Sequence, residues 1–299
     1  MKRIAILGAG ELGSCIGKLL QKNKKLSIEW WDANPQKVPN QKPLATLVSC
    51  TDFLFLCVPS WVFRKALEQV RPHLKKTTIV VSFAKGIERK TQLTMDVLLN
   101  EVLHRNQPTV LVSGPMLAEE LEMNLPAGGI LAAKNRRAYE RVAALFAHTP
   151  ITCCYSSDVR GVALAGVLKN IYATALGAVD GLGLGMNARG LVIVRAADEM
   201  ARILPLLGGK AATTYSLAGI GDLIATGSSN YSKNYSVGKE LALSGVCGIE
   251  SEGKSSIAAF ESMLGGKAAT FKLFQVVKAI LSCKKDARSA LSRYFKKCE

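Results

Sequence analysis

The sequence KRIAILGAGELGSCIGKLLQKNKKLSIEWWD, residues 2–32, determines the architecture of the first half of the chain. An apolar run over residues 2–7 predicts a buried strand, residues 14–21 predict a helix, and residues 26–31 predict a second strand. The pattern G-x-G-x-x-G of residues 8–13 stands between the first strand and the helix. In this setting it is typical of a dinucleotide-binding unit, because the glycines let the backbone approach a pyrophosphate and the start of the helix offers free N–H groups.

The glycine-rich turn is expected to bind NAD or NADP. The residues expected to contact the cofactor there are Gly8, Gly10, Glu11, Leu12 and Gly13. Asp32 ends the second strand, where a carboxylate hydrogen-bonds a ribose 2′-OH and repels a 2′-phosphate. Asp32 therefore favours NADH, although NADPH stays open. The alternative is that Asp32 is only a turn residue before Asn34 and Pro35.

Further apolar strands alternate with helical segments. We expect strands over residues 53–58, 78–82 and 110–112, and a helix over residues 61–70. This alternation predicts an α/β fold with a doubly wound, Rossmann-type parallel sheet. In such sheets ligands bind beyond the carboxyl ends of the strands. The residues expected at these ends are Gly8, Asp32, Pro59, Lys85 and Gly114.

The alternation stops in the middle of the chain. After a last short strand expected near Ile151, helical patterns dominate from about Ser157. We therefore place a dinucleotide-binding domain at residues 1–156 and an all-α substrate and catalytic domain at residues 157–299.

Residues 162–179 are apolar almost all the way round, which predicts a helix buried in a core. Lys169 lies in the middle of this helix, where an ammonium group is costly unless a polar or charged partner meets it. Burial also lowers the pKa of a lysine, so Lys169 is a candidate proton donor and acceptor. The alternative is that Lys169 snorkels to the surface. A membrane span is not expected, because Lys169, Asn170 and Asp180 interrupt the run.

Composition narrows the classes of partner and site. The net charge of +16 attracts anions, but no nucleic-acid-binding motif accompanies it, so we expect surface charge and steering of an anionic substrate. The eight cysteines form no C-x-x-C pair and there are three histidines, so we expect neither disulfides nor a metal site. Gly8, Gly10 and Glu11 break the first apolar run, which argues against a signal peptide and for a cytoplasmic protein.

Several short motifs follow one another along the chain. They are GAGELG (8–13), CVPS (57–60), KGIE (85–88), SGP (113–115) with Ala118 and Glu120, LKN (168–170), DGLGLGMNA (180–188), LAGIGDL (217–223), SNYSKN (229–234) and SEG (251–253). In this order they resemble the glycerol-3-phosphate dehydrogenase (NAD(P)+) family. The resemblance covers about residues 1–275 and is most specific in LKN, DGLGLGMNA and LAGIGDL.

The resemblance implies an NAD(P)-dependent oxidoreductase that interconverts dihydroxyacetone phosphate and sn-glycerol 3-phosphate, and so supplies phospholipid synthesis. Lys169 resembles the family's proton-transferring lysine, Lys85 its second lysine, which would help to lower the pKa of Lys169, and Asp222 the aspartate that orients the site. The other positions that resemble substrate-binding residues are Gly114, Asn170, Thr226, Ser232, Lys233 and Asn234. Those that resemble further cofactor-binding residues are Lys85, Ala118, Lys233 and Glu252.

Simpler interpretations exist for three of these positions. Lys85 is then an ordinary surface lysine, Asp222 a helix cap, and residues 232–234 a polar loop.

Three departures from the family pattern leave Lys169 unchanged and are expected to affect the binding of substrate and cofactor. Lys233 stands where the family usually has an arginine, and it lacks the bidentate fork that grips a phosphate. Met116 replaces a serine and offers no hydroxyl, and the segment 32–51 is shorter. We expect an active enzyme that binds its ligands weakly.

Two alternatives remain, a reductase of another keto substrate and a non-catalytic nucleotide-binding protein. The apolar helical half is also consistent with a homodimer.

Overall fold

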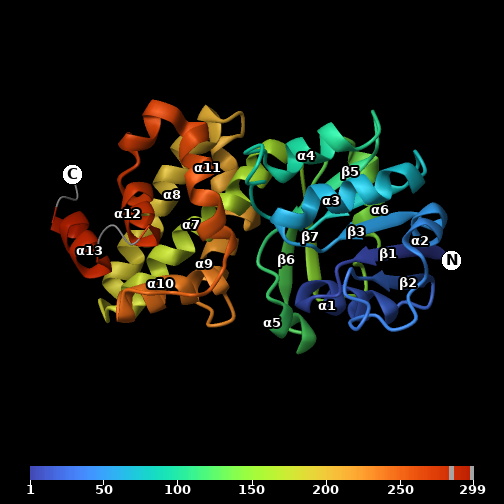
Figure 1. Cartoon of the computed structure of the whole chain (residues 1–299), viewed down its shortest axis with the longest axis horizontal. Coiled ribbons are helices and arrows are strands. Elements are labelled where there is room, and N and C mark those ends of the chain that lie inside the picture. The colour runs from blue at the N-terminus through green and yellow to red at the C-terminus, as the bar shows by residue number, and fades with distance from the viewer. Residues whose placement is uncertain (283–285, 297–299) are drawn as a thin grey trace. The chain divides into compact units, whose positions relative to one another are not determined.

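The computed structural model describes residues 1–282 and 286–296, so Cys283 and Cys298 lie outside the described residues. The chain divides into two units (Figure 1). The first unit consists of Met1–Glu88 and Leu93–Val159, and the second of Arg89–Gln92 and Arg160–Glu299. The division falls in the first turn of a long helix, a few residues beyond Ser157.

The first unit is built on one seven-stranded sheet with the order β2-β1-β3-β4-β5-β6-β7. The strands are β1 (Lys2–Leu7), β2 (Leu26–Trp31), β3 (Phe53–Leu56), β4 (Ile79–Ser82), β5 (Thr109–Ser113), β6 (Ala127–Ala132) and β7 (Ile151–Ser156). Neighbouring strands are parallel except for β5 and β6, which pair antiparallel. The expected Rossmann-type sheet is confirmed, with this one exception. The connection from β5 holds only the five-residue helix α5 (Ala118–Glu122), which is too short to carry the chain back along the sheet.

Helices cover both faces of this sheet. The chain moves from β1 to β2 in one direction and from β2 through β3 to β5 in the other, so right-handed crossovers put the intervening helices on opposite faces. The helix on one face is α1 (Glu11–Gln21), and those on the other are α2 (Leu44–Cys50), α3 (Ser60–Val70) and α4 (Met95–Val102). The strand order reverses beside β1, which is where ligands bind in such sheets.

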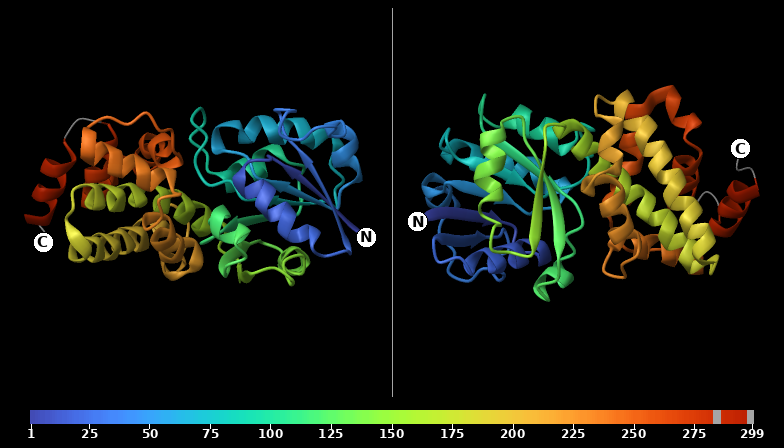
Figure 2. Two further views of the ribbon diagram at one scale, coloured as in Figure 1. Left: turned by 90° about the horizontal axis from the view of Figure 1, so that it is seen from below. Right: turned by 180° about the vertical axis from the view of Figure 1, so that it is seen from behind.

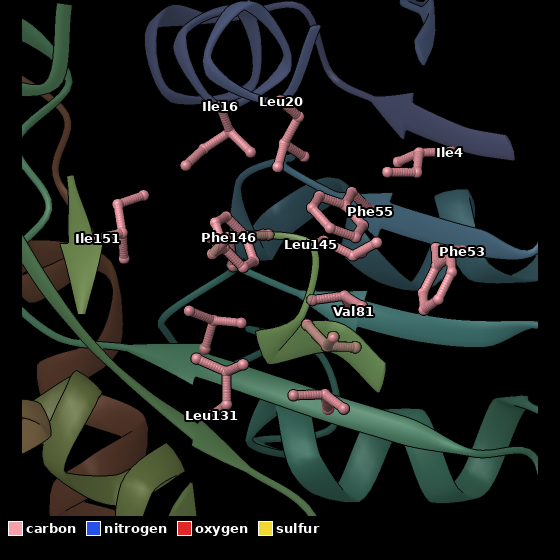
Figure 3. Packing of buried hydrophobic residues seen from close by; sticks show 14 of the residues in the cluster. Ile4, Ile16, Leu20, Phe53, Phe55, Val81, Leu131, Leu145, Phe146 and Ile151 are labelled. Atoms are coloured by element: carbon pink, nitrogen blue, oxygen red, sulfur yellow. The ribbon is translucent and has the colours of Figure 1, made fainter. Parts of the chain in front are cut away.

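The core of the first unit lies between α1, α6 (Arg136–Ala143) and the sheet. Figure 3 shows Ile16 and Leu20 of α1 pointing toward Phe55 and Phe146. The rings of Phe55 and Phe146 stack with centroids 6.1 Å apart. This packing fixes α1 on the sheet and therefore fixes where its N-terminus lies.

The second unit is helical in all its described elements, as Figures 1 and 2 show. Its α-helices are α7 (Val159–Gly181), α8 (Gly185–Leu206), α9 (Asp222–Gly227), α10 (Lys233–Ser244), α11 (Glu252–Leu264), α12 (Lys272–Leu281) and α13 (Ala287–Lys296). Shorter turns of helix are η2 (Ala211–Tyr215), η3 (Leu217–Gly221) and η4 (Gly265–Thr270), and η1 (Arg71–His73) belongs to the first unit. By length and apolarity α7 qualifies as a membrane span, but the qualifying stretch is wholly buried inside the protein.

Two glycines let α7 and α10 pack backbone against backbone. A Cβ atom at Gly238 of α10 would overlap the carbonyl oxygen of Thr174 on α7. A Cβ atom at Gly177 of α7 would likewise overlap the carbonyl oxygen of Tyr235 on α10. The two helices are therefore closer than any side chain at these positions would permit. We call this contact the glycine seam.

The glycine seam predicts opposite effects for two glycine-to-alanine substitutions. Gly238→Ala forces a methyl group against backbone and should lower the free energy of unfolding by about 3 kcal/mol, the upper range for overpacking. Gly190→Ala, in the second turn of α8 with open space around the added carbon, should raise the free energy of unfolding by up to about 1 kcal/mol through helix propensity. Urea denaturation followed by circular dichroism measures both. Equal stability of the two variants would contradict the seam.

Candidate active site

The glycine-rich turn joins β1 to α1 and leaves the helix N-terminus open. Gly8 has a φ of +99°, and a Cβ atom there would lie 2.5 Å from the carbonyl oxygen of Cys57. A Cβ atom at Gly13 would overlap the carbonyl oxygen of Gly8. The predicted helix start at residue 14 is wrong, because α1 begins at Glu11. Glu11, Leu12 and Gly13 thus form the first helical turn, whose N–H groups have no partner within the helix.

Asp32 contacts the glycine-rich turn directly. Its Oδ2 atom accepts a hydrogen bond from the Ala9 N–H at 2.8 Å, and its Oδ1 atom accepts one from the Asn34 N–H at 2.9 Å. Lys37 Nζ lies 4.0 Å from Oδ2. Asp32 is therefore both a turn residue and a carboxylate held beside the glycines.

The short segment after β2 folds back onto Asp32. The Gln41 side chain bonds both backbone groups of Asp32, accepting from its N–H at 2.8 Å and donating to its carbonyl oxygen at 2.9 Å. The Gln41 side chain thus satisfies the two backbone groups of Asp32 that a neighbouring strand would otherwise pair.

Lys85 and Gly114 meet at the carboxyl edge of the sheet. Lys85 Nζ donates to the carbonyl oxygen of Gly114 at 3.3 Å. Gly114 has a φ of +147°, and a Cβ atom there would overlap the carbonyl oxygen of Gly128. Met116 packs beside Gly129 and the hydrophobic core, so its thioether serves packing. Ala118 begins α5.

Lys169 is buried, with 6% of its surface exposed, and it meets two polar side chains. Its Nζ atom lies 3.1 Å from Asp222 Oδ1 and donates to Thr226 Oγ1 at 2.7 Å. Thr226 Oγ1 donates in turn to Asp222 Oδ1 at 3.1 Å. Lys169 therefore does not snorkel, and the Asp222 carboxylate faces Lys169 rather than capping a helix. We call these three residues the lysine triad.

A second cluster lies one residue further along α7. Asn234 Nδ2 donates to Asn170 Oδ1 at 2.9 Å, and Asn234 Oδ1 accepts from the Gly253 N–H at 2.8 Å. A Cβ atom at Gly253 would lie 2.7 Å from the carbonyl oxygen of Asn170, so α11 approaches α7 closely. Glu252 begins α11.

The alternative interpretation of residues 232–234 as a polar loop is wrong for Lys233 and Asn234, because helix α10 begins at Lys233. Ser232 caps this helix, accepting from the Tyr235 N–H at 3.3 Å. Lys233 is exposed and Asn234 is buried in its first turn. The N-terminus of a helix attracts anions.

Sequence reasoning missed a buried arginine of α8. Arg189 pairs with Asp180 at the end of α7. It also donates to the Gly227 carbonyl oxygen at 3.1 Å and to Ser228 Oγ at 2.8 Å. Its helical spacing from the buried Val192 was the available signal.

The described residues contain no cluster of side chains that could hold a metal ion, and no disulfide. No cluster of three or more histidine, cysteine or acidic side chains is present there, and the six cysteines in those ranges are free. The site therefore offers amines, amides, hydroxyls and one buried carboxylate.

Two family descriptions match the chain. "NAD-dependent glycerol-3-phosphate dehydrogenase N-terminus" matches residues 32–139, and the corresponding "C-terminus" matches residues 158–292. The glycerol-3-phosphate dehydrogenase (NAD(P)+) of Clostridium botulinum is 30% identical over 320 residues, which cover 97% of this chain and 96% of that protein. The Syntrophotalea carbinolica protein of the same name is 32% identical over 322 residues, with 97% and 96% coverage. The crystal structure of glycerol-3-phosphate dehydrogenase from Coxiella burnetii is 28% identical, covers 99% of both chains and gives a TM-score of 0.87.

The cysteine beneath the glycine-rich turn should be chemically inert. Burial raises the pKa of the Cys57 thiol to about 12, so the reactive thiolate appears only as the pH approaches that value. At pH 8 we expect Cys57 to react with iodoacetamide at least about tenfold more slowly than the exposed Cys50, and the gap should narrow above pH 10. Mass spectrometry of the labelled peptides measures both rates. Comparable labelling at pH 8 would contradict the raised pKa of this thiol.

Proposed function

The chain belongs to the NAD-dependent glycerol-3-phosphate dehydrogenase family, and we propose that Lys169 is the residue with which it transfers the proton of that reaction. The reaction interconverts dihydroxyacetone phosphate and sn-glycerol 3-phosphate with NAD(P)H. The observation that carries the assignment is the lysine triad. A buried ammonium that donates to the Thr226 hydroxyl and pairs with the Asp222 carboxylate is held in a defined place and direction.

Each member of the lysine triad has a distinct task in this proposal. The nicotinamide cofactor supplies the hydride when bound. As the carbonyl carbon of the substrate is reduced, Lys169 gives a proton to the carbonyl oxygen, and in the reverse direction it takes that proton back. Asp222 offsets the charge of the ammonium, and Thr226 orients it through the bond at 2.7 Å. Lys85 and Gly114 are proposed to contact the substrate as well.

The substrate phosphate is proposed to bind at the start of α10. Ser232, Lys233 and Asn234 combine a helix N-terminus, one positive charge and an amide. Asn170 is joined to Asn234 and would share the contact with substrate. Lys233 offers a point charge in place of a guanidinium fork, so affinity for the phosphate should be modest.

The residues of the glycine-rich turn fit a dinucleotide. Gly8 and Gly13 keep this turn tight, because a Cβ atom at either would run into a backbone carbonyl oxygen, and the first turn of α1 offers free N–H groups. We propose that NADH is preferred, because the carboxylate of Asp32 is held against this turn by the Ala9 N–H. Other residues proposed to contact the cofactor are Gly10, Glu11, Leu12, Lys85, Ala118, Lys233 and Glu252.

Three further features complete the proposal. The product would supply phospholipid synthesis. The six described cysteines are free, which fits a cytoplasmic protein, and the buried α7 fits one without membrane insertion. Met186 and Val194 are exposed apolar side chains of α8 that a second copy of the chain could cover in a homodimer.

Removing the amine at position 169 should abolish turnover without affecting the cofactor. For Lys169→Ala we expect kcat with dihydroxyacetone phosphate to fall by about a thousandfold, within the range that general acid catalysis contributes, while the Kd for NADH stays unchanged. Lys267→Ala, at an exposed position in η4, should keep full activity. NADH oxidation at 340 nm and fluorescence titration provide the two readouts. A kcat within tenfold of wild type would rule out Lys169 as the proton donor.

Removing the charge of Asp32 should shift cofactor preference. Asp32→Asn keeps an acceptor for the Ala9 N–H but no longer repels a 2′-phosphate, so the ratio of kcat/KM for NADPH to that for NADH should rise about tenfold. Asp52→Asn is a matched control, because its carboxylate accepts a backbone N–H from Arg3 in the same way. An unchanged ratio in Asp32→Asn, or a wild-type preference for NADPH, would contradict the assignment.

A further inference from the structure

The loop between α9 and α10 leads to the proposed phosphate site at the start of α10. Ser228, Asn230 and Tyr231 are exposed. Within the loop, the Tyr231 N–H donates to Ser229 Oγ at 3.2 Å, and the Ser232 N–H donates to the Ser229 carbonyl oxygen at 3.1 Å. These bonds shape the loop but do not attach it to the rest of the unit.

Arg189 attaches the beginning of this loop. One guanidinium nitrogen donates to both the Gly227 carbonyl oxygen and Ser228 Oγ. Gly227 is the last residue of α9 and follows Thr226 of the lysine triad. A cation at the carboxyl end of a helix is favourable, and the burial of Arg189 keeps water from competing for these bonds.

The same network reaches the end of the loop. Asp180 pairs with Arg189 and accepts a hydrogen bond from the Tyr235 hydroxyl at 2.8 Å. Burial, followed by the hydrogen bond to Asp180, raises the pKa of Tyr235, so its hydroxyl remains a donor at neutral pH. The Tyr235 N–H in turn donates to Ser232 Oγ. A single chain of bonds therefore ties Ser228 and Ser232, the two ends of the loop.

We propose that Arg189 is a positioning residue for the substrate phosphate: by holding Gly227 and Ser228 it sets the loop that leads to Ser232 and Lys233 at the start of α10. The inference rests on the proposed function. Arg189 bonds Asp180, Gly227 and Ser228, which are not members of the lysine triad, so loss of its guanidinium should weaken substrate binding more than it slows proton transfer.

Steady-state kinetics of four variants tests this. Arg189→Gln should raise the KM for dihydroxyacetone phosphate about tenfold or more, with kcat changed less than about threefold and the KM for NADH unchanged. Arg189→Lys keeps the charge beside Asp180 but loses the fork, so its KM should lie between those of Arg189→Gln and wild type. Tyr235→Phe, which cuts the bond to Asp180, should raise the KM by a smaller factor. Arg202→Gln removes another arginine of α8, one in an exposed pair with Asp198, and should behave as wild type.

Hydrogen exchange provides a readout that does not depend on turnover. In Arg189→Gln the amides of residues 228–235 should exchange faster, while those in the middle of α7 keep their protection. An unchanged KM and unchanged exchange in Arg189→Gln would overturn the inference. Parallel increases in the KM values for both substrates, with loss of protection in α7, would also overturn it and make Arg189 a general scaffold residue. If wild type fails to reduce dihydroxyacetone phosphate, the proposed function fails and the inference fails with it.

Discussion

The charge of Lys169 has to be balanced where it lies, deep in α7. An isolated ammonium costs several kcal/mol in such a place, and the partners that offset this cost come from one short helix, α9. Asp222 and Thr226 are four residues apart, so they share one face of α9 and reach the amine together. Once α9 is placed by the ion pair, the loop that follows it starts at a defined point. The second unit is thus arranged around a polar contact that its apolar helices surround.

In both units, glycines allow backbone atoms to approach one another closely. In the first, Gly8 and Gly13 keep the turn between β1 and α1 narrow enough for backbone N–H groups to face a ligand. In the second, Gly177, Gly238 and Gly253 bring α10 and α11 against α7, which carries Lys169 and Asn170. In both units the glycines act through the backbone that they let approach, and polar side chains then complete the site.

Much of this follows from local sequence signals. The strands are short apolar runs, and the setting of Lys169 in an apolar helix identified it as a candidate without any partner in view. The start of α1 was misplaced because Gly13 lowers the helix propensity of its first turn. The direction of β6 depends on how the chain leaves β5, which an apolar run does not encode. Arg189 bonds residues that are 9, 38 and 39 positions away in the sequence, and a helical or strand periodicity does not predict such contacts. A role for Asp222 in the site was expected only through family resemblance, and its pairing with Lys169 was not predicted.

The glycine seam also bears on how the site responds to its surroundings. In the seam, the neighbouring-helix atoms closest to Gly177 and Gly238 are backbone atoms. Such contacts act over short distances and are not screened by dissolved ions, whereas exposed ion pairs weaken as ionic strength rises. The position of Asn234 relative to Asn170 should therefore be kept in concentrated salt. Any loss of affinity under those conditions would then arise from the charge of the ligand itself and not from rearrangement of the helices that receive it.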